Sequence, residues 1–224
     1  MADPSAVGEA ASDLLPFAHN HVPEKFPSFG ITVGFSKYLS SFATVEQAFH
    51  AIEDVHRAEG FSLPPAEGVR LSPMVLPTFR LQFDRSFGAA LQIGWADGPR
   101  DDLRLIGGLV SGRTTRWPGD RISFFAELGG GRYEFKFTRS YGARITPFDG
   151  AGGYYELERI VLKGSGSYWT TAGGLTLHAG PRGAIEALVQ YVGTDDVSTD
   201  AAGAGRVSLN LSGTMIGVSA GFRF

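Results

Sequence analysis

GVSAGFRF, residues 217–224, ends the sequence and supports two opposite interpretations. Its first five residues match G-x-S-x-G, the motif in which many hydrolases present a nucleophilic serine between a strand and a helix. Only three residues follow Gly221, so neither the helix nor the downstream histidine of such a site can exist here. The motif is instead typical of a β-strand, because alternate residues are apolar, namely Ile216, Val218, Ala220, Phe222 and Phe224.

The same alternation of apolar with small or polar residues recurs along the chain. It predicts strands at 28–40, 74–84, 87–97, 103–113, 122–138, 168–180, 183–193 and about 207–224. In 103–113 the apolar residues fall on both faces, so the orientation of that segment stays open. In 122–138 the parity changes across Gly129–Gly131, which predicts a β-bulge there, and a second bulge is expected near Gly213.

Composition narrows the class of protein. The chain has no cysteine, so disulfides and thiolate metal sites are excluded, and a net charge of −3 argues against nucleic acid as a partner. No apolar run is long enough for a membrane helix, and the N-terminus lacks the pattern of a signal peptide, which we expect to have been removed. A membrane protein of this composition would have to be a β-barrel.

Three features favour a membrane barrel over a soluble, lipocalin-like ligand-binding barrel. The face opposite the apolar one is too polar for a dry core. Connections are mostly short at one end (84–86, 114–120, 180–182) and long at the other (41–72, 139–166, 194–206). Aromatic residues gather at strand ends, as expected at membrane interfaces, and include Trp95, Trp117, Trp169 and Tyr191.

The first long connection contains a helix signal. Thr44 to Gln47 has the pattern of a capping box, and apolar residues then recur at helical spacing until Gly60. We expect an amphipathic helix that covers the barrel mouth. His50, Glu53 and Asp54 lie within one turn of it, but a metal site would need further ligands, so we predict no metal and no cofactor.

Several polar residues have inward parity in the predicted strands. An eight-stranded barrel is just wide enough for side chains to fill it, so acidic and basic members should pair. The predicted lumen network consists of Arg80, Glu127, His178, Glu186, Gln190 and Arg223. Such a network would hold the barrel shut; a gated narrow path is the alternative. A conduit would instead need an apolar lining, for which Leu76, Ile106 and Val110 are the candidates if they point inward.

The C-terminal alternation that ends in Phe224 resembles the signal that the barrel-assembly machinery reads in bacterial outer-membrane proteins. The segment FAELGGGRYEFKF, residues 125–137, resembles the central strand of small barrels of the OmpA, OmpX and OmpW kind. The resemblance covers about residues 28–224 as a pattern. It implies an eight-stranded antiparallel up-and-down transmembrane barrel, and a ten-stranded barrel with a strand at YYELERIVLK (154–163) is the alternative.

The expected protein is therefore a bacterial outer-membrane barrel, residues 28–224, preceded by a partly disordered periplasmic segment, residues 1–27. We predict no catalytic residues and a structural role or an interaction through the loops 41–72 and 139–166. The expected partners are outer-membrane lipid, lipopolysaccharide, the barrel-assembly machinery and a possible protein partner. The resemblance to the OmpW kind implies a conduit for small hydrophobic compounds as the alternative function.

Overall fold

A computed structural model describes residues 26–39, 42–63, 68–84, 86–98, 100–114, 121–145, 155–179, 182–201 and 205–224. Residues 1–25 of the expected N-terminal segment and Trp117 lie outside these ranges. Within the described residues, no helix combines the length and the apolar character needed to cross a membrane.

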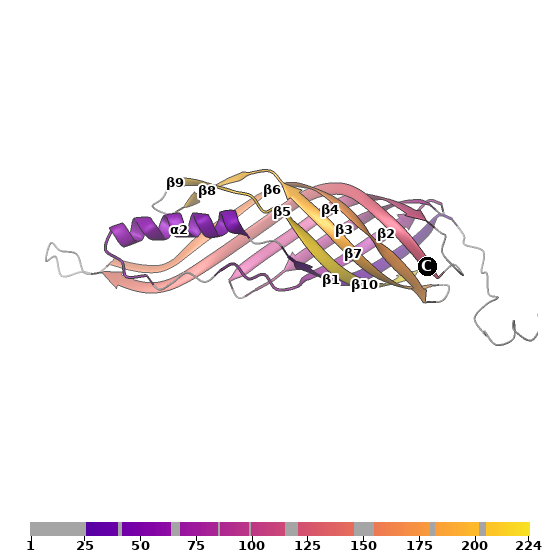
Figure 1. Cartoon of the computed structure of the whole chain (residues 1–224), viewed down its shortest axis with the longest axis horizontal. Coiled ribbons are helices and arrows are strands. Elements are labelled where there is room, and N and C mark those ends of the chain that lie inside the picture. The colour runs from indigo at the N-terminus through magenta and orange to yellow at the C-terminus, as the bar shows by residue number, and fades with distance from the viewer. Residues whose placement is uncertain are drawn as a thin grey trace, which may run out of the picture.

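Eight antiparallel strands close into a barrel in the order β1-β10-β7-β6-β5-β4-β3-β2 (Figure 1). Their bounds are β1 Ser28–Tyr38, β2 Met74–Gln82, β3 Phe87–Ala96, β4 Asp101–Thr114, β5 Ile122–Ile145, β6 Tyr155–Ala179, β7 Gly183–Thr194 and β10 Gly213–Arg223. The prediction of eight strands is confirmed. The ten-stranded alternative is wrong, because residues 155–163 are the first part of β6 and pair with β5.

Side chains alternate between the lumen and the outer surface along every strand of the barrel. On β1, Thr32, Gly34 and Ser36 are buried, whereas Val33 and Phe35 are exposed. The outer surface is apolar on all sides, with exposed residues that include Phe29, Leu91, Val110, Leu128, Leu175, Val189, Ile216 and Val218. The polar face is therefore inside and the apolar face outside, which is the reverse of a soluble barrel.

The bulge expected at Gly129–Gly131 is absent. Strand β5 pairs with β4 and β6 without interruption through this segment, and its register shift lies between Ser140 and Ala143. The glycines instead allow neighbouring strands to approach closely, because a Cβ on Gly131 would collide with the backbone of β4 at Ile106. Parity is retained, so the apolar residues beyond Gly131 point inward rather than outward.

The last strand is shorter than predicted. Val207 belongs to β9 (Gly205–Leu209), which pairs with β8 (Val197–Ala201) in a separate two-stranded sheet. The chain turns between β9 and β10, where Thr194 Oγ1 accepts from the backbone N–H of Leu211 at 2.9 Å and Thr194 N–H donates to Ser212 Oγ at 2.9 Å. A break in the strand thus takes the place of the bulge expected near Gly213.

Helix α2 (Ala43–Ala58) confirms the helix predicted in the first long connection. The capping box is wrong, because the N-cap residue is Phe42 and no side chain caps the helix. Thr44 is used for a tertiary contact instead: its hydroxyl donates to Asn210 O at 2.7 Å and accepts from Asn210 N at 3.1 Å. The helix is thereby tied to the turn that follows β9.

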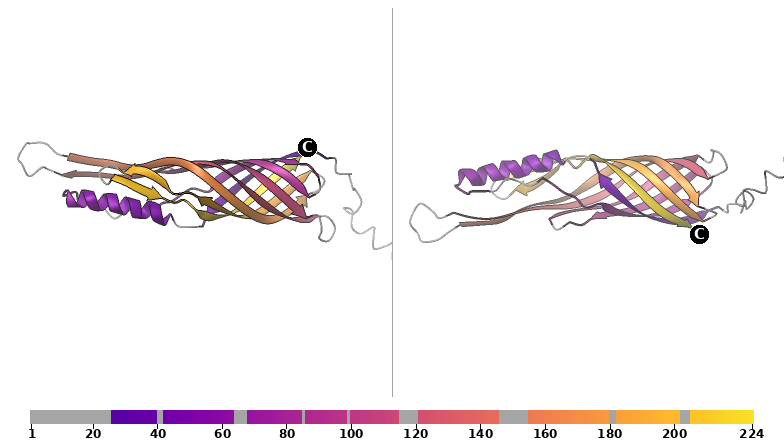
Figure 2. Two further views of the ribbon diagram at one scale, coloured as in Figure 1. Left: turned by 90° about the horizontal axis from the view of Figure 1, so that it is seen from above. Right: turned by 60° about the horizontal axis from the view of Figure 1, so that its bottom comes forward.

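Beyond one end of the barrel, β5 and β6 continue as a long hairpin within the connection 139–166. Helix α2 and the β8-β9 sheet lie alongside this hairpin (Figure 2). We call α2, β8, β9 and the projecting parts of β5 and β6 the cap. Its apolar core includes Val45, Phe49, Ile52, Phe137, Ile160, Leu162 and Leu209, all at most 2% exposed.

Candidate functional site

The lumen holds a cluster of four charged side chains from four strands. Arg80 of β2, Arg113 of β4, Glu127 of β5 and Glu186 of β7 all lie on inward positions, because each keeps the parity of the buried residues in its strand. Both carboxylates are almost fully buried, at 4% and 2% exposed. The cluster contains two cations and two anions, so its formal charge is balanced.

Glu186 accepts hydrogen bonds from two arginines. Arg80 Nη2 donates to it at 3.1 Å and Arg113 Nη2 at 3.0 Å, while Arg80 Nη1 also donates to Glu127. The hydroxyls of Thr176 and Ser219 donate to Glu186 at 3.3 and 3.4 Å. A buried ion pair offsets the cost of desolvation only when its remaining polar atoms are also satisfied, as they are at Glu186.

Of the other residues of the expected lumen network, Gln190 and His178 contact residues outside this cluster, whereas Arg223 lies close enough to Arg113 for their charges to interact. Gln190 donates from Nε2 to Gln92 Oε1 at 3.1 Å and to Thr170 Oγ1 at 2.9 Å. His178 Nε2 lies 3.0 Å from Ser123 Oγ. The guanidinium of Arg223, near the end of β10, lies 6.0 Å from the ring of Phe26. The expected set is therefore divided among separate contacts along the lumen.

Arg113 is the member of the cluster that sequence reasoning missed. The orientation of β4 was open, and the inward positions prove to be those of Asp101, Leu103, Leu105, Leu109, Ser111 and Arg113. Ile106 and Val110 are 52% and 51% exposed and face outward. The prediction that they line a conduit inside the barrel is therefore wrong. Leu76 does point inward and is buried. The predicted network already balanced two carboxylates with Arg80 and Arg223, so no signal in the sequence called for Arg113.

Side chains change character along the lumen. From the cap end, the inward residues of β7 are Val192, Gln190, Leu188 and Glu186. Those of β2 are Met74, Leu76, Thr78, Arg80 and Gln82. The apolar core of the cap thus continues into the mouth of the barrel and gives way to amides and then to ions. A cavity beside Arg80 and Gln92 has a volume of about 10 Å³, room for about one water.

Two polar contacts fix the cap over the mouth. Arg139 of β5 donates to Asp101 of β4 at 3.0 Å, and its guanidinium lies 4.7 Å from the ring centroid of Phe49 on α2. Glu53 of α2 is fully buried and accepts a hydrogen bond from the hydroxyl of Tyr141. Burial, followed by this hydrogen bond and the neighbouring carboxylate of Glu53, raises the pKa of Tyr141 above its ordinary value.

The three residues of α2 that were considered as metal ligands, where no metal was predicted, make short-range contacts within the helix. His50 Nδ1 lies 3.3 Å from Glu53 Oε2, and Asp54 accepts from Arg57 at 2.8 Å. Among the described residues, no three histidine, aspartate or glutamate side chains are grouped so that they could hold a metal ion.

Aromatic and apolar residues of the expected interface and tail lie on the outer surface. Trp95, Trp169 and Tyr191 are 37%, 52% and 39% exposed, and the rings of Trp169 and Tyr191 lie 5.3 Å apart. On β10 the outward residues are Ile216, Val218, Ala220 and Phe222, followed by the exposed Phe224. Ser219 points into the lumen, where it contacts Glu186.

No protein-family model matches the sequence, and no curated protein matches it. Solved structures do match. The outer membrane protein OprG from Pseudomonas aeruginosa aligns with a TM-score of 0.51 at 14% identity, over 90% of this chain and 97% of that one. The chain therefore has the fold of the small outer-membrane β-barrel proteins.

Two further structures are similar at lower scores. The N-terminal β-barrel domain of OprF from Pseudomonas aeruginosa has a TM-score of 0.46 at 10% identity, over 88% of this chain and 98% of that one. The Neisserial surface protein A has a TM-score of 0.45 at 9% identity, over 88% and 94%.

Proposed function

We propose that this protein is a non-enzymatic outer-membrane barrel that acts as a structural or interaction element through its cap. Support for the membrane location comes from the apolar outer surface, on which Phe35, Leu128 and Val218 are 62%, 64% and 59% exposed. In water such a surface would cause aggregation, whereas in a bilayer the lipid chains cover it and no protein partner is needed to bury it. This observation also weighs against the soluble ligand-binding barrel.

One observation carries the choice between a scaffold and a conduit: the lumen is filled at successive levels by different kinds of contact. The apolar core of the cap occupies the mouth, the amides of Gln92 and Gln190 lie within the barrel, and the Glu186 cluster lies beyond them. A hydrophobic compound entering from the cap would have to displace α2 and then cross an ion cluster. The conduit implied by the resemblance to the OmpW kind is therefore the weaker proposal.

An enzyme would need a nucleophile and a base that substrate can reach. Ser123 and His178 are within hydrogen-bond distance, at 3.0 Å, but Ser123 is 2% exposed. A substrate could not reach the hydroxyl of Ser123 at this level of burial. We infer that the two side chains only satisfy each other's hydrogen-bonding groups inside the lumen.

The cap is suited to present a fixed surface. Helix α2 buries its apolar side and exposes Gln47, His50, Asp54 and Arg57. Because the helix is held by Arg139 and Glu53 as well as by the apolar core, it would bind a partner with little loss of conformational entropy. A protein partner for the cap, and recognition of the β10 tail by the barrel-assembly machinery, are parts of this proposal.

The test has two stages. The full chain is refolded into detergent micelles and run in SDS with and without boiling, and the unboiled sample is expected to migrate as a compact, SDS-resistant species. It is then placed in liposomes that report ion leakage and uptake of a hydrophobic dye. Neither leakage nor uptake above protein-free liposomes is expected. Uptake by the unmodified chain would overturn the scaffold in favour of the conduit.

A matched pair of variants locates any path that is found. Glu186→Gln disturbs the ion cluster in the lumen, whereas Lys37→Gln changes an exposed residue on the outer surface of β1. Leakage that appears only with the first variant would identify the cluster as the seal of the lumen.

A further inference from the structure

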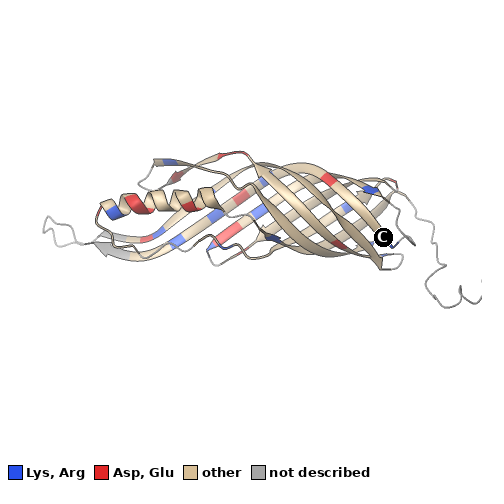
Figure 3. Ribbon diagram, viewed as in Figure 1, with Lys and Arg blue, Asp and Glu red and all other residues tan. Residues whose placement is uncertain are grey.

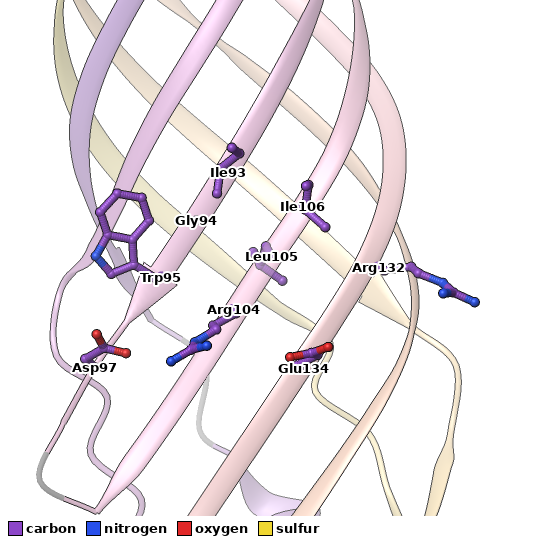
Figure 4. Close-up of a pocket in the computed structure, with 9 residues that line it drawn as sticks. All are labelled: Ile93, Gly94, Trp95, Asp97, Arg104, Leu105, Ile106, Arg132 and Glu134. Carbon is purple, nitrogen blue, oxygen red and sulfur yellow. The ribbon is translucent and has the colours of Figure 1, made fainter.

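The outer wall of β3, β4 and β5 is not uniform. It contains a groove with a volume of about 540 Å³, within the range of small-molecule sites, about 300–1,000 Å³. Most of the side chains that border it lie on outward positions, whereas Gly94 and Leu105, which also line it, lie on inward positions of β3 and β4, so the groove opens on the outer surface (Figure 4). Ile93, Trp95 and Ile106 form its apolar part, and Arg104, Arg132, Asp97 and Glu134 its polar part.

The strand register gives the positions of these residues along the barrel axis. Ile93 of β3 is paired with Ile106 of β4, which is paired with Arg132 of β5. One step nearer the cap, Trp95 is paired with Arg104, which is paired with Glu134. The wall therefore changes from apolar to charged at the level of an exposed tryptophan, the residue type that marks a membrane interface.

A pair of glycines lies one step further from the cap. Gly108 of β4 and Gly130 of β5 are direct partners on the outward face, with Leu91 and Trp169 beside them on β3 and β6. A Cβ on Gly108 would meet nothing nearer than the Ala90 carbonyl oxygen at 4.0 Å, so space outside this position is open. Glycine within a strand often marks a place where a ligand approaches the backbone closely.

Basic residues continue beyond the groove in the direction of the cap, on β5 and β6 (Figure 3). Lys136 and Lys163 are direct cross-strand partners and both are exposed. Like charges in this relation repel and destabilise a sheet unless something neutralises them. The cross-strand acid Asp102 accepts a hydrogen bond from Gly98 N at 3.3 Å. In the part of the chain that the structure describes, the side chains of Arg104, Arg132, Lys136 and Lys163 make no hydrogen bond or ion pair.

We propose that this wall binds one phosphorylated lipid of the surrounding membrane. Its acyl chain lies in the apolar groove over Gly108, and its phosphate groups contact Arg104, Arg132, Lys136 and Lys163. The proposal rests on the proposed membrane location, since a groove on this face meets lipid only if the barrel spans a bilayer. It goes beyond general solvation by lipid, because it assigns one wall of the barrel and four named cations.

Charge complementarity favours a phosphorylated headgroup over an uncharged one. Asp97 and Glu134 also border the groove, but they lie at its edge nearest the cap, whereas Arg132 lies beside the apolar part (Figure 4). Lys136 and Lys163 then add positive charge above them. Each basic residue near a membrane surface contributes about fivefold to the affinity for anionic lipid.

The probe is diphosphoryl lipid A, titrated onto the full chain in zwitterionic detergent micelles and counted as bound lipid by native mass spectrometry. The double variant Lys136→Gln/Lys163→Gln removes two cations and is expected to weaken binding by about tenfold to thirtyfold. Gly108→Val places a side chain in the open space beside the groove, where its Cβ meets no backbone atom nearer than 4.0 Å, and is expected to weaken binding by a similar factor. The control is Lys37→Gln, an exposed lysine on β1, four strands from β5 around the barrel, which should bind as the unmodified chain does.

Each outcome has one meaning. Weaker binding in both test variants, with an unchanged control and an unchanged SDS gel shift, supports the site. Equal binding by all variants that retain the gel shift overturns the lipid site and leaves the membrane barrel intact. Equally tight binding of the deacylated, phosphorylated disaccharide also overturns it, because the ligand would then be a soluble glycan. Loss of the gel shift in the unmodified chain overturns the proposed function itself.

Discussion

Neutralising Glu186 is the sharpest test of the lumen cluster. The carboxylate is 2% exposed and receives hydrogen bonds from Arg80 and Arg113. With Glu127 it balances the two arginines, so Glu186→Gln leaves one buried cation without a counter-charge. Breaking a buried pair in this way costs about 3–5 kcal/mol. Because glutamine still accepts one hydrogen bond, we expect a loss near the lower value, about 3 kcal/mol.

The assay is equilibrium urea unfolding of the refolded chain in zwitterionic micelles, followed by tryptophan fluorescence and by the SDS-resistant fraction. Glu158→Gln is the matched control, since Glu158 is exposed on the projecting part of β6 and its replacement should change stability by less than about 0.5 kcal/mol. The double variant Arg113→Met/Glu186→Gln restores the charge balance and should regain most of the loss. If Glu186→Gln and Glu158→Gln unfold at the same urea concentration, the cluster does not stabilise the barrel as argued here.

Three further predictions concern the cap and the outer surface. Phe137 is 0% exposed and contacts the rings of Phe42 and Phe135. Phe137→Ala should lower the stability of the cap by about 3–5 kcal/mol. Residues 43–58 should then exchange amide hydrogens faster, while the SDS gel shift persists. Because the pKa of Tyr141 is raised in the folded state, its neutral form stabilises the cap fully below pH ~10, and this contribution is lost as pH rises through the folded pKa. Protection of helix α2 from hydrogen exchange should therefore fall only above pH ~10. Tyr141→Phe should remove that pH dependence. Leu128→Lys, on a side chain that is 64% exposed, should lower stability in phospholipid vesicles by about 2–4 kcal/mol, and an effect as small as that of Lys37→Gln would contradict membrane contact at that level.

Sequence reasoning was most successful where a single physical constraint acts along a whole strand. In β1 and β10 the outward residues must be apolar and the inward residues small or polar, so alternation alone gives the correct faces. The charges in the lumen followed from the same rule, because an inward carboxylate such as Glu127 requires a cation nearby. Which cations it would meet depends on strand register, which no local pattern specifies.

The errors fall where this constraint stops. In β4 both faces carry apolar residues, because Leu103 and Leu105 contact the apolar core of the cap while Ile106 and Val110 face outward. The break between β9 and β10 depends on hydrogen bonds between Thr194 and residues that follow β9, a contact between separate elements that propensity does not reveal. Thr44 was assigned to a helix cap for the same reason, since its true partner is Asn210.

The inward face of β5 shows why a change of parity was mistaken for a bulge. Near Glu127 that face lines a polar lumen, and the outer side carries the apolar residues. Beyond Gly131 the strand stays paired with β4 as far as Phe137, but its outer side now carries Arg132, Glu134 and Lys136. Its inner side, with Tyr133, Phe135 and Phe137, forms part of the core of the cap. Side chains continue to alternate between the same two faces along the whole strand. The surroundings of the two faces change, so that the inner face becomes apolar and the outer face polar. A change of hydrophobic parity in a long strand of a small barrel therefore indicates either a bulge or the level at which the strand leaves the bilayer. Here uninterrupted pairing excludes a bulge, and under the proposed membrane location the exposed Lys136 and Lys163 on the outer side agree with the second case.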